Sequence, residues 1–386
     1  DLLDQYGPNI KNEITPESWE TVTNNGKIYG IPYRTERPNI EAAIFYRKDI
    51  LDDLGLPEPR TVEEFHEVLK KVKAAYPDMI PFTDSGETAY VEGGTMTGGI
   101  NVPSIYSAFG LYTDWMEING ELVPRILQPG MKDYIAFMAG LFKEGLIDQD
   151  LPINKIATKE EKFTSGRAFA MSSTWNDSPR IKPNLLNNIP DAELGYLDPL
   201  TDAQGNAGIK ALYKLTRVTA IPKNSKHPED AIKFINTKLE PDNFTYLALG
   251  TEGETFVVED GKYRAINPIF SEKRSNAYWY MNGMDEHRYP DMWLARLHKS
   301  DAMIEAFENI NENFDKFAVF DPTSMMPPLE AVTKNIAALV QLENEYYIKV
   351  LLGDENLDNF DAFLETWKNS GGADMVKAVN EWYASK

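Results

Sequence analysis

Short apolar runs bounded by turn residues mark several strands along the chain. The runs 42–46 and 167–171 predict buried strands, and the runs 27–33 and 217–221 each predict a strand closed by a proline. Three turn pairs predict hairpins: Asn25-Gly26, Asn119-Gly120 and Asp260-Gly261.

Helical spacing of apolar residues predicts helices between and after these strands. Thr61 and Glu64 have the spacing of a capping box, ahead of a helix whose apolar face includes Phe65, Val68 and Leu69. Further helices are predicted after Pro228 and over 131–142, 332–351, 360–367 and 376–383. Strands that alternate with helices, followed by a helical tail, predict an α/β fold with a helical C-terminal region.

The composition indicates a folded protein with more than one unit. The chain has 386 residues, of which 42% are hydrophobic, which suffices for two or three cores. Its 39 basic and 60 acidic residues give a net charge of −21, which repels polyanions, so we do not expect nucleic acid as a partner. Because cysteine is absent, no disulfide, thiolate metal site or cysteine nucleophile is possible.

One stretch, 276–293, combines five aromatic rings with amides and charges and follows neither a helical nor an alternating period. Aromatic faces stack on the C–H faces of sugars, while polar neighbours take hydrogen bonds from the hydroxyls. The stretch therefore indicates either a sugar site or an irregular core segment.

Several short motifs share their order and spacing with one protein family. They are Leu3–Ile10, Gly26–Tyr33, Tyr46–Asp49, Leu54–Pro57, Leu141–Asp148, Ile221–Ala231 and Leu351–Asp354. In these motifs the chain resembles extracellular solute-binding proteins of carbohydrate ABC importers, especially oligosaccharide-binding lipoproteins of Gram-positive bacteria and alginate-binding proteins.

The resemblance implies a two-lobe clamp of the periplasmic-binding-protein type, with a hinge between the lobes. It assigns 1–84 and 217–270 to the first lobe, and 85–216 and 271–386 to the second. It also implies strand–helix units and a lipidated cysteine upstream of Leu3, so we expect the first lobe to be incomplete at its N-terminus. The alginate-binding relatives carry a calcium loop where this chain has residues 75–80, so we predict no calcium there.

The second lobe supplies the first group of candidate ligand-binding residues. Trp175, Asn176 and Asp177 directly follow a buried strand, where open α/β folds place their sites, and the resemblance implies a stacking tryptophan there. The alternative for Trp175 is a place in the core. Tyr278 and Trp279 are predicted to add stacking contacts.

Further candidates are less specific. Trp293 is one, although Pro290 and Leu294 beside it suggest packing. The first lobe supplies Tyr33, Arg34 and Arg37. The guanidinium groups of the two arginines suit vicinal hydroxyls or a uronate carboxylate. An exposed, salt-bridged loop is the alternative for these arginines. The resemblance places Glu252 near the rim of the cleft.

Nothing in the sequence points to catalysis or to a cofactor. The four histidines lack the spacing of a zinc-binding helix, and the adjacent pair Asp285 and Glu286 has almost no specificity for glycoside chemistry. We therefore predict no catalytic residue and no metal ligand.

Together these features predict a non-enzymatic extracellular receptor that closes its lobes on an oligosaccharide and delivers it to ABC permease subunits. The alternatives are a carbohydrate-active enzyme, either a glycoside hydrolase or a lyase, and a scaffold or adhesion module. We expect a monomer that is attached to the cell surface as a lipoprotein or is periplasmic. Its membrane contact would be only an N-terminal lipid anchor outside this chain. The net charge leans slightly against a polyuronate, but Arg34 and Arg37 prevent its exclusion, so the sequence leaves open whether the ligand is neutral or acidic.

Overall fold

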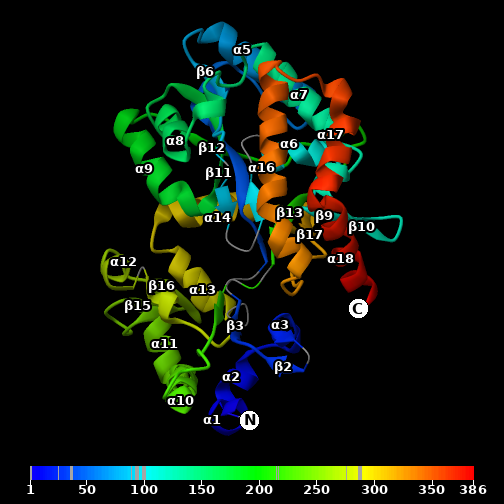
Figure 1. Ribbon diagram of the computed structural model, residues 1–386. Coiled ribbons are helices and arrows are strands. Elements are labelled where there is room, and N and C mark those ends of the chain that lie inside the picture. Colours follow the sequence, from blue (N-terminus) through cyan, green and yellow to red (C-terminus); the bar gives the residue numbers. More distant parts are fainter. Residues whose placement is uncertain are drawn as a thin grey trace. The chain divides into compact units, whose positions relative to one another are not determined.

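The computed structural model describes the chain except residues 1, 25, 35–37, 88, 92–94, 98–100, 214, 216, 275 and 286–288, and it describes only the backbone of 89–91, 95–97 and 278–279 (Figure 1). Contacts divide the chain into two compact units. Unit 1 comprises 1–39, 213–304 and 323–327, and unit 2 comprises 40–212, 305–322 and 328–386.

This division differs from the predicted lobe boundaries in two long stretches and in two short ones, 213–216 and 323–327, which belong to unit 1. Residues 40–84 belong to unit 2, because β5 (Ala42–Arg47) lies inside the main sheet of that unit. Residues 271–304 belong to unit 1, because Met281, Met284 and Ala295 pack in its core.

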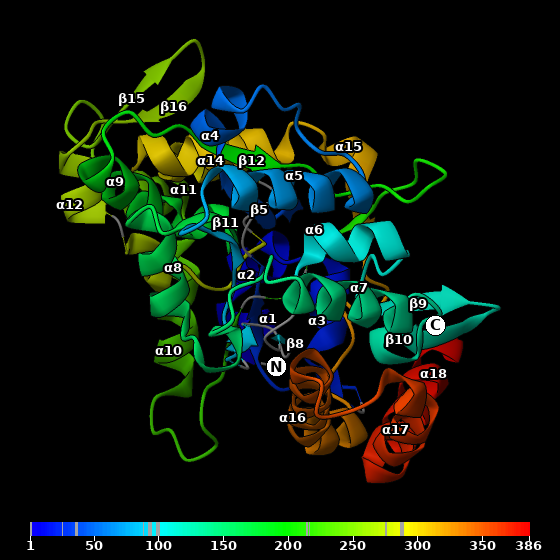
Figure 2. The ribbon, with the colours of Figure 1, turned by 90° about the horizontal axis from the view of Figure 1, so that it is seen from above.

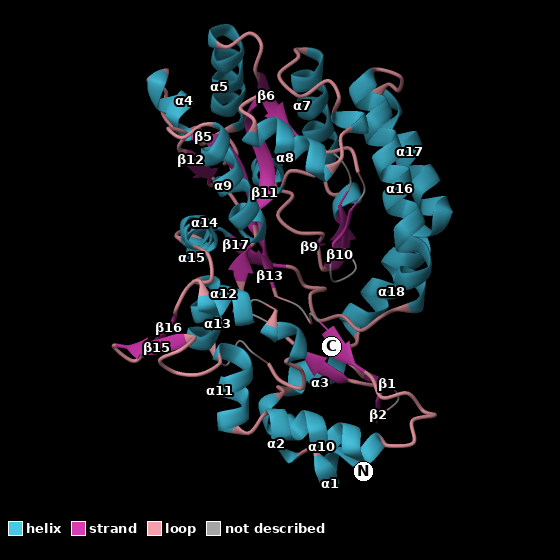
Figure 3. Cartoon of the chain, turned by 90° about the vertical axis from the view of Figure 1, so that its left-hand side faces the viewer, coloured by secondary structure: helices cyan, strands magenta, loops and turns pink. Residues whose placement is uncertain are grey.

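The main sheet of unit 2 has the strand order β12-β5-β11-β6 (Figure 3). β12 (Leu194–Leu197) and β11 (Ala168–Thr174) both run antiparallel to β5, whereas β6 (Ile80–Thr83) runs parallel to β11. The side chains of β5 and β11 are almost all buried, as expected for strands covered on both faces.

Close packing inside this sheet requires a glycine at one position. In β12, a Cβ atom on Gly195 would lie 2.4 Å from the ring of Tyr46, which is its partner on β5. Because such a contact is impossible without a shift of the ring, glycine at this position makes room for the Tyr46 side chain.

Helices surround this sheet. α8 (Ile156–Thr164) packs on β11 and β6, and α5 (Val62–Ala75) packs on β6. The remaining helices of unit 2 are α4 (Lys48–Asp53), α6 (Pro103–Tyr106), α7 (Met131–Lys143), α9 (Ser178–Asn188), α15 (Phe314–Phe317), α16 (Glu330–Leu352), α17 (Phe360–Trp367) and α18 (Ala373–Ala384). The helices α16, α17 and α18 lie together (Figure 2).

Smaller strands complete unit 2. They are β7 (Ala89–Val91), β8 (Thr95–Thr97), β9 (Trp115–Ile118), β10 (Glu121–Pro124), β13 (Ile209–Leu212) and β17 (Ala318–Phe320). β9 and β10 form an antiparallel hairpin, and β13 pairs in parallel with β17.

Unit 1 is built from short helices and three small sheets. Its helices are α1 (Leu2–Tyr6), α2 (Pro8–Glu13), α3 (Pro16–Thr21), α10 (Pro228–Lys238), α11 (Pro241–Leu249), α12 (Ile269–Arg274), α13 (Pro290–Leu297) and the 3-10 helix η5 (Ala277–Tyr280). Its strands are β1 (Thr23–Asn24), β2 (Lys27–Ile28), β3 (Ile31–Tyr33), β14 (Arg217–Thr219), β15 (Phe256–Glu259) and β16 (Lys262–Ala265). β4 (Asn39–Ile40) and α14 (Asp301–Asn311) run across the boundaries between the units along the chain.

Among the described residues of unit 1, two hydrophobic clusters lie in its core. In the first, Tyr33 and Phe270 are fully buried beside residues of α11 and α13. In the second, Ile10 and Ile31 pack against Ile232 and Ile235 of α10. Ile232 and Ile235 therefore face inward, whereas Phe234 on the same helix is 68% exposed.

Many predicted elements are confirmed. The capping box of Thr61 and Glu64 begins α5, and Pro228 occupies the first turn of α10. Asn119-Gly120 and Asp260-Gly261 both form hairpin turns with positive φ angles. The predicted strand over 27–33 is instead divided into β2 and β3. The described residues contain no helix that is long and apolar enough to cross a membrane.

Candidate functional site

The parallel strands β6 and β11 bring two polar segments to one edge of the unit 2 sheet. β6 ends at Thr83 and is followed by Asp84. β11 ends at Thr174 and is followed by the 3-10 helix η4 (Trp175–Asp177). Because open α/β sheets place ligands beyond the carboxyl ends of their strands, this edge is the candidate functional site. The name unit 2 sheet edge refers below to Glu41, Asp84, Lys159, Ser172, Asn176 and Asp177.

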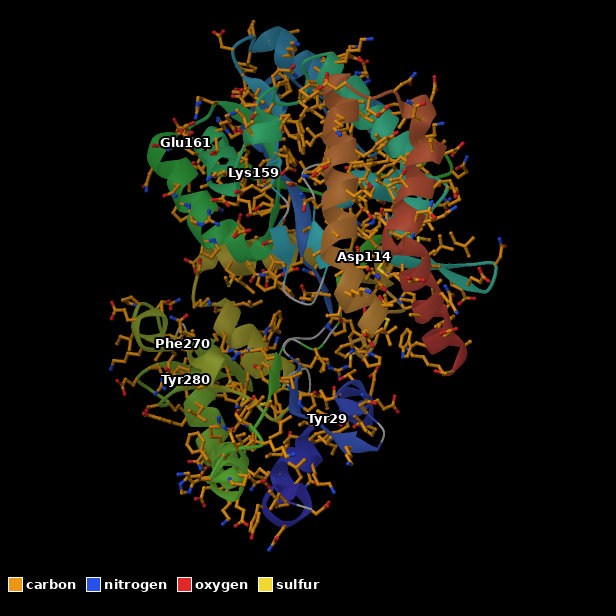
Figure 4. The ribbon with its side chains drawn as sticks, viewed as in Figure 1. Tyr29, Asp114, Lys159, Glu161, Phe270 and Tyr280 are labelled. Carbon is orange, nitrogen blue, oxygen red and sulfur yellow. The ribbon has the colours of Figure 1, made fainter. Side chains whose placement is uncertain are left out.

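Asp84 organises the buried part of the unit 2 sheet edge. Its carboxylate accepts hydrogen bonds from Lys159 Nζ at 2.9 Å and from the hydroxyl of Ser172. Lys159 Nζ also donates to Ser172 Oγ at 3.2 Å. Lys159 lies on α8, the helix that also carries Glu161 (Figure 4). The side chains of Lys159 and Asp84 are only 12% and 9% exposed, so this ion pair forms part of the wall of the site.

A second buried network supports Asp84. Lys162 Nζ donates to Asp148 Oδ2 at 2.8 Å and to Asn154 Oδ1 at 3.1 Å. Asp148 also accepts a hydrogen bond from Thr83 Oγ1 at 2.7 Å, and Asn154 Nδ2 donates to the carbonyl of Asp84 at 3.0 Å. Burial raises the pKa of Asp148, but hydrogen bonds from Lys162 and Thr83 outweigh it and lower the pKa overall. The network fixes the backbone at the end of β6.

The exposed part of the edge presents hydrogen-bonding groups to solvent. Asn176 is exposed and donates from Nδ2 to Glu41 Oε1 at 3.1 Å. Asp177 accepts from Thr174 Oγ1 at 3.0 Å and from Arg180 Nη2 at 2.9 Å. An amide and two carboxylates in this arrangement can donate to and accept from sugar hydroxyls.

Trp175 lies beside these groups, but its side chain points into unit 2. It is 2% exposed, and its ring meets Phe307 edge-on at a centroid distance of 5.4 Å. Its backbone N–H donates to the carbonyl of Glu41 at 3.1 Å. In this conformation the indole anchors η4, and a stacking contact with ligand stays a prediction.

In unit 1, Tyr33 and Arg34 are both buried. Arg217 lies over the ring of Tyr33, with 4.7 Å between the guanidinium carbon and the ring centroid. The guanidinium of Arg34 lies 3.6 Å from Glu17 and 3.7 Å from Asp285. Arg34 is therefore ion-paired, as in the predicted alternative of an exposed, salt-bridged loop. Its side chain is not exposed as that alternative requires, because only 3% of it is accessible to solvent. Arg37 falls outside the described residues.

The aromatic stretch 276–293 contributes mainly to the core of unit 1. Met281 and Met284 are buried there, and Trp293 on α13 is 3% exposed. Tyr280 is 69% exposed, and Lys238 Nζ donates to its carbonyl at 3.0 Å. The side chains of Tyr278 and Trp279 fall outside the described part of the chain, and their role as ligand contacts stays a prediction.

Glu252 lies in an exposed turn that leads into β15. The turn is held by its backbone, since the N–H of Gly253 donates to the carbonyl of Phe256 at 2.7 Å. Its side chain is available to solvent, and its role in binding also stays a prediction.

The sequence did not single out Asp84, Lys159, Ser172 or Glu41. Asp84 follows a strand and opens a polar, glycine-rich stretch, which is a signal that could have identified it. Lys159 and Glu41 offered no such signal, because their position depends on how α8 and β5 pack beside β11. Within the described residues, no group of three or more His, Asp or Glu side chains could hold a metal ion.

Comparisons with known proteins give this site a context. A family model described as bacterial extracellular solute-binding protein matches residues 1–253. An uncharacterised protein from Niallia circulans is 38% identical over 251 residues, which are 65% of this chain and 98% of that protein. The polygalacturonan/rhamnogalacturonan-binding protein of Bacillus subtilis is 25% identical over 99% of this chain and 74% of its own length.

The fold is also found among solved structures. A crystal structure of an alginate-binding protein without calcium ion matches with a TM-score of 0.71 and 19% identity, over 99% of this chain and 80% of that chain. This similarity confirms the predicted two-lobe substrate-binding fold, with its helical C-terminal region.

Proposed function

Because this chain belongs to the family of bacterial extracellular solute-binding proteins, we propose that the solute it binds is an oligosaccharide. Members of this family bind a solute for an ABC transporter and catalyse no reaction, so the chain is a binding protein and not an enzyme. The observation that carries the proposal is the similarity, over nearly the whole chain, to proteins that bind sugars, both acidic ones such as polygalacturonan and alginate and a neutral one, kestose.

The unit 2 sheet edge supports this proposal chemically. Asn176 offers an amide, while Glu41 and Asp177 offer carboxylate oxygens at the end of a rigid strand. Sugar hydroxyls both donate and accept hydrogen bonds, and they match such a mixed set. We assign Asn176 and Asp177 to direct contacts, with Trp175 beneath them as an anchor.

On unit 1, we propose that Tyr278 and Trp279 supply stacking surfaces. Trp293, Tyr33 and Arg34, which are buried, are packing residues of the same unit. Arg37 and Glu252 would add polar contacts. Ligand binding then shifts the population toward a closed form, because ligand contacts from both lobes coexist only there.

The proposed partners are the permease subunits of the transporter, which would receive the sugar from a monomeric, extracellular binding protein. We propose attachment to the cell surface through a lipid anchor, as the resemblance implies. Size-exclusion chromatography with light scattering checks the monomer, and crosslinking in membranes checks the permease contact.

A thermal-shift screen against an oligosaccharide library tests the function. A true ligand raises the melting temperature in a concentration-dependent way, because it binds only the folded state. Mass spectrometry of the recovered glycan should show an unchanged mass. No stabilisation by any library member would reject an oligosaccharide ligand, and turnover of a stabilising glycan would reject a pure binding role.

Two substitutions test the proposed contacts once a ligand is found. Trp279→Ala and Asn176→Ala should each weaken binding, the tryptophan by roughly 1–3 kcal/mol if its ring stacks on the ligand as aromatic rings stack on nucleic acid bases. Asn188→Ala, on the same unit as Asn176, serves as a control that should keep full affinity. Titration calorimetry measures all three, and unchanged affinity in both test variants would place the site elsewhere.

A further inference from the structure

We infer that the ligand is an uncharged oligosaccharide and not a polyuronate. This inference rests on the proposed function and narrows its substrate class. It is carried by how charge is divided between the two units and by how the cations near the candidate site are paired.

The two units differ strongly in net charge. Unit 1 contains 17 Lys and Arg against 19 Asp and Glu, a net charge of −2, whereas unit 2 contains 22 against 41, a net charge of −19. The unit with the candidate sheet edge therefore carries nearly all of the negative charge of the chain. Its field repels anions, and a polyuronate adds one negative charge per sugar unit.

The cations at the unit 2 sheet edge do not offset this field locally. Lys159 is held by the carboxylate of Asp84, as described above. Arg180 pairs with Glu160 and also with Asp177, at 2.9 Å. A uronate would therefore have to displace a carboxylate that already occupies the cation, and the displaced carboxylate would stay in the site.

Other partly buried cations of unit 2 follow the same rule. Each of the following has an Asp or Glu partner within ion-pair distance: Arg47, Arg125, Lys162, Lys182 and Lys210. The positive charge of each of these side chains is balanced by a carboxylate of the same unit, because an unpaired ion at a buried position would destabilise the fold.

On unit 1, Arg34 is one of the two cations that the sequence offered to a polyuronate, and the other, Arg37, lies outside the described residues. Its guanidinium faces Glu17 and the fully buried Asp285, and it lies 4.7 Å from the centroid of the Tyr213 ring. Asp285 also accepts hydrogen bonds from Ser18 Oγ and from the backbone N–H of Thr15 at 2.8 Å. This network holds Arg34 as a structural cation.

Two partly exposed carboxylates at the sheet edge suit hydroxyls. The carboxylates of Glu41 and Asp177 accept hydrogen bonds but cannot donate one when ionised. A sugar hydroxyl can donate a further hydrogen bond to these carboxylates, whereas a uronate carboxylate brings only acceptors and a like charge.

The test uses matched glycans that differ only in charge. The intact chain is titrated by calorimetry with two pairs of ligands. The first pair is oligogalacturonides and their fully methyl-esterified forms. The second pair is the neutral oligosaccharide that stabilises the chain most in the screen and the same sugar oxidised to the acid at C6. Each titration is repeated at about 20 mM and about 500 mM salt, which changes the screening length severalfold.

Within each pair of glycans that binds, we expect the uncharged form to bind at least tenfold more tightly than the acidic form at low salt. This ratio of affinities should become smaller at high salt, because salt screens the repulsion. An acidic member that binds more tightly than its uncharged partner, with an affinity that falls as salt rises, would overturn the inference and leave the proposed function intact. Failure of every glycan to bind would instead reject the proposed function, and the inference with it.

Discussion

Glu343 shows how its surroundings set the pKa of a partly buried side chain. It lies on α16, and its Oε1 accepts a hydrogen bond from Trp367 Nε1 at 2.7 Å. Burial raises its pKa to about 7, against the opposing effects of this hydrogen bond and of Arg125. The folded protein therefore favours the protonated form.

The pKa of Glu343 gives a pH-dependent stability. An unfolded glutamate titrates near pH 4.3, so between about pH 4.3 and 7 the folded state binds a proton that the unfolded state does not. Stability from this group is present at low pH and is lost as pH rises through that window. Glu343→Gln keeps the acceptor for Trp367 without the charge, and should stabilise the chain on the order of 2 kcal/mol at pH 8.

Chemical denaturation at pH 4.5 and pH 8 measures this effect. The gain from Glu343→Gln should be close to zero at the lower pH. Glu345→Gln, an exposed neighbour on α16, is the control and should change little at either pH. An equal gain for Glu343→Gln at both pH values would contradict the account.

Trp175 provides a second prediction for a single residue. Its side chain is buried against Phe307, so Trp175→Ala would leave a large cavity and should cost about 3–5 kcal/mol of unfolding free energy. Trp382→Ala, near the C-terminus and only partly buried, should cost clearly less. Urea denaturation compares the two, and a cost below about 1 kcal/mol for Trp175→Ala would mean that the indole does not anchor η4.

At the scale of elements, local signals explain much of what the sequence could predict. The capping box at Thr61, the hairpin turns at 119–120 and 260–261 and the long helix α16 each depend on neighbours a few residues away. The burial of Trp175 and Arg34 depends on α14 residues and on Asp285, which lie more than 100 residues away in the chain. Such long-range partners have no local signature.

Among these elements, disruption of the hydrogen-bond network at the end of β6 should lower the free energy of unfolding most. Lys162→Met would leave Asp148 buried without its cation, and should cost about 3–5 kcal/mol at pH 7. Because the folded pKa of Asp148 is lowered, its contribution is present above about pH 4 and is lost as pH falls through its folded value. The loss of unfolding free energy caused by Lys162→Met should therefore be smaller at acidic pH than at pH 7.

Lys155→Met, an exposed position immediately before α8, is the matched control for Lys162→Met. Denaturation curves at pH 7 and pH 3 compare the two variants. A cost that is small at pH 7, or that stays constant down to pH 3, would show that Asp148 does not depend on Lys162 for its charge.

At the scale of the whole molecule, family membership shows what the chain does, and the charge distribution supports the inferred class of ligand. The chain binds a solute outside the cell, and unit 2 carries most of the negative charge. Composition revealed the total charge, but its division required the contacts that assign 40–84 to unit 2. The site residues on the aromatic stretch and the identity of the sugar depend on side-chain positions and contacts that no sequence motif specifies.

The most direct measurement is a calorimetric titration of the intact chain with the oligosaccharide that stabilises it most, followed by mass spectrometry of the recovered sugar. The account predicts saturable binding with one site per chain and a sugar of unchanged mass. Absence of saturable binding, or a sugar recovered in shorter pieces, would contradict it.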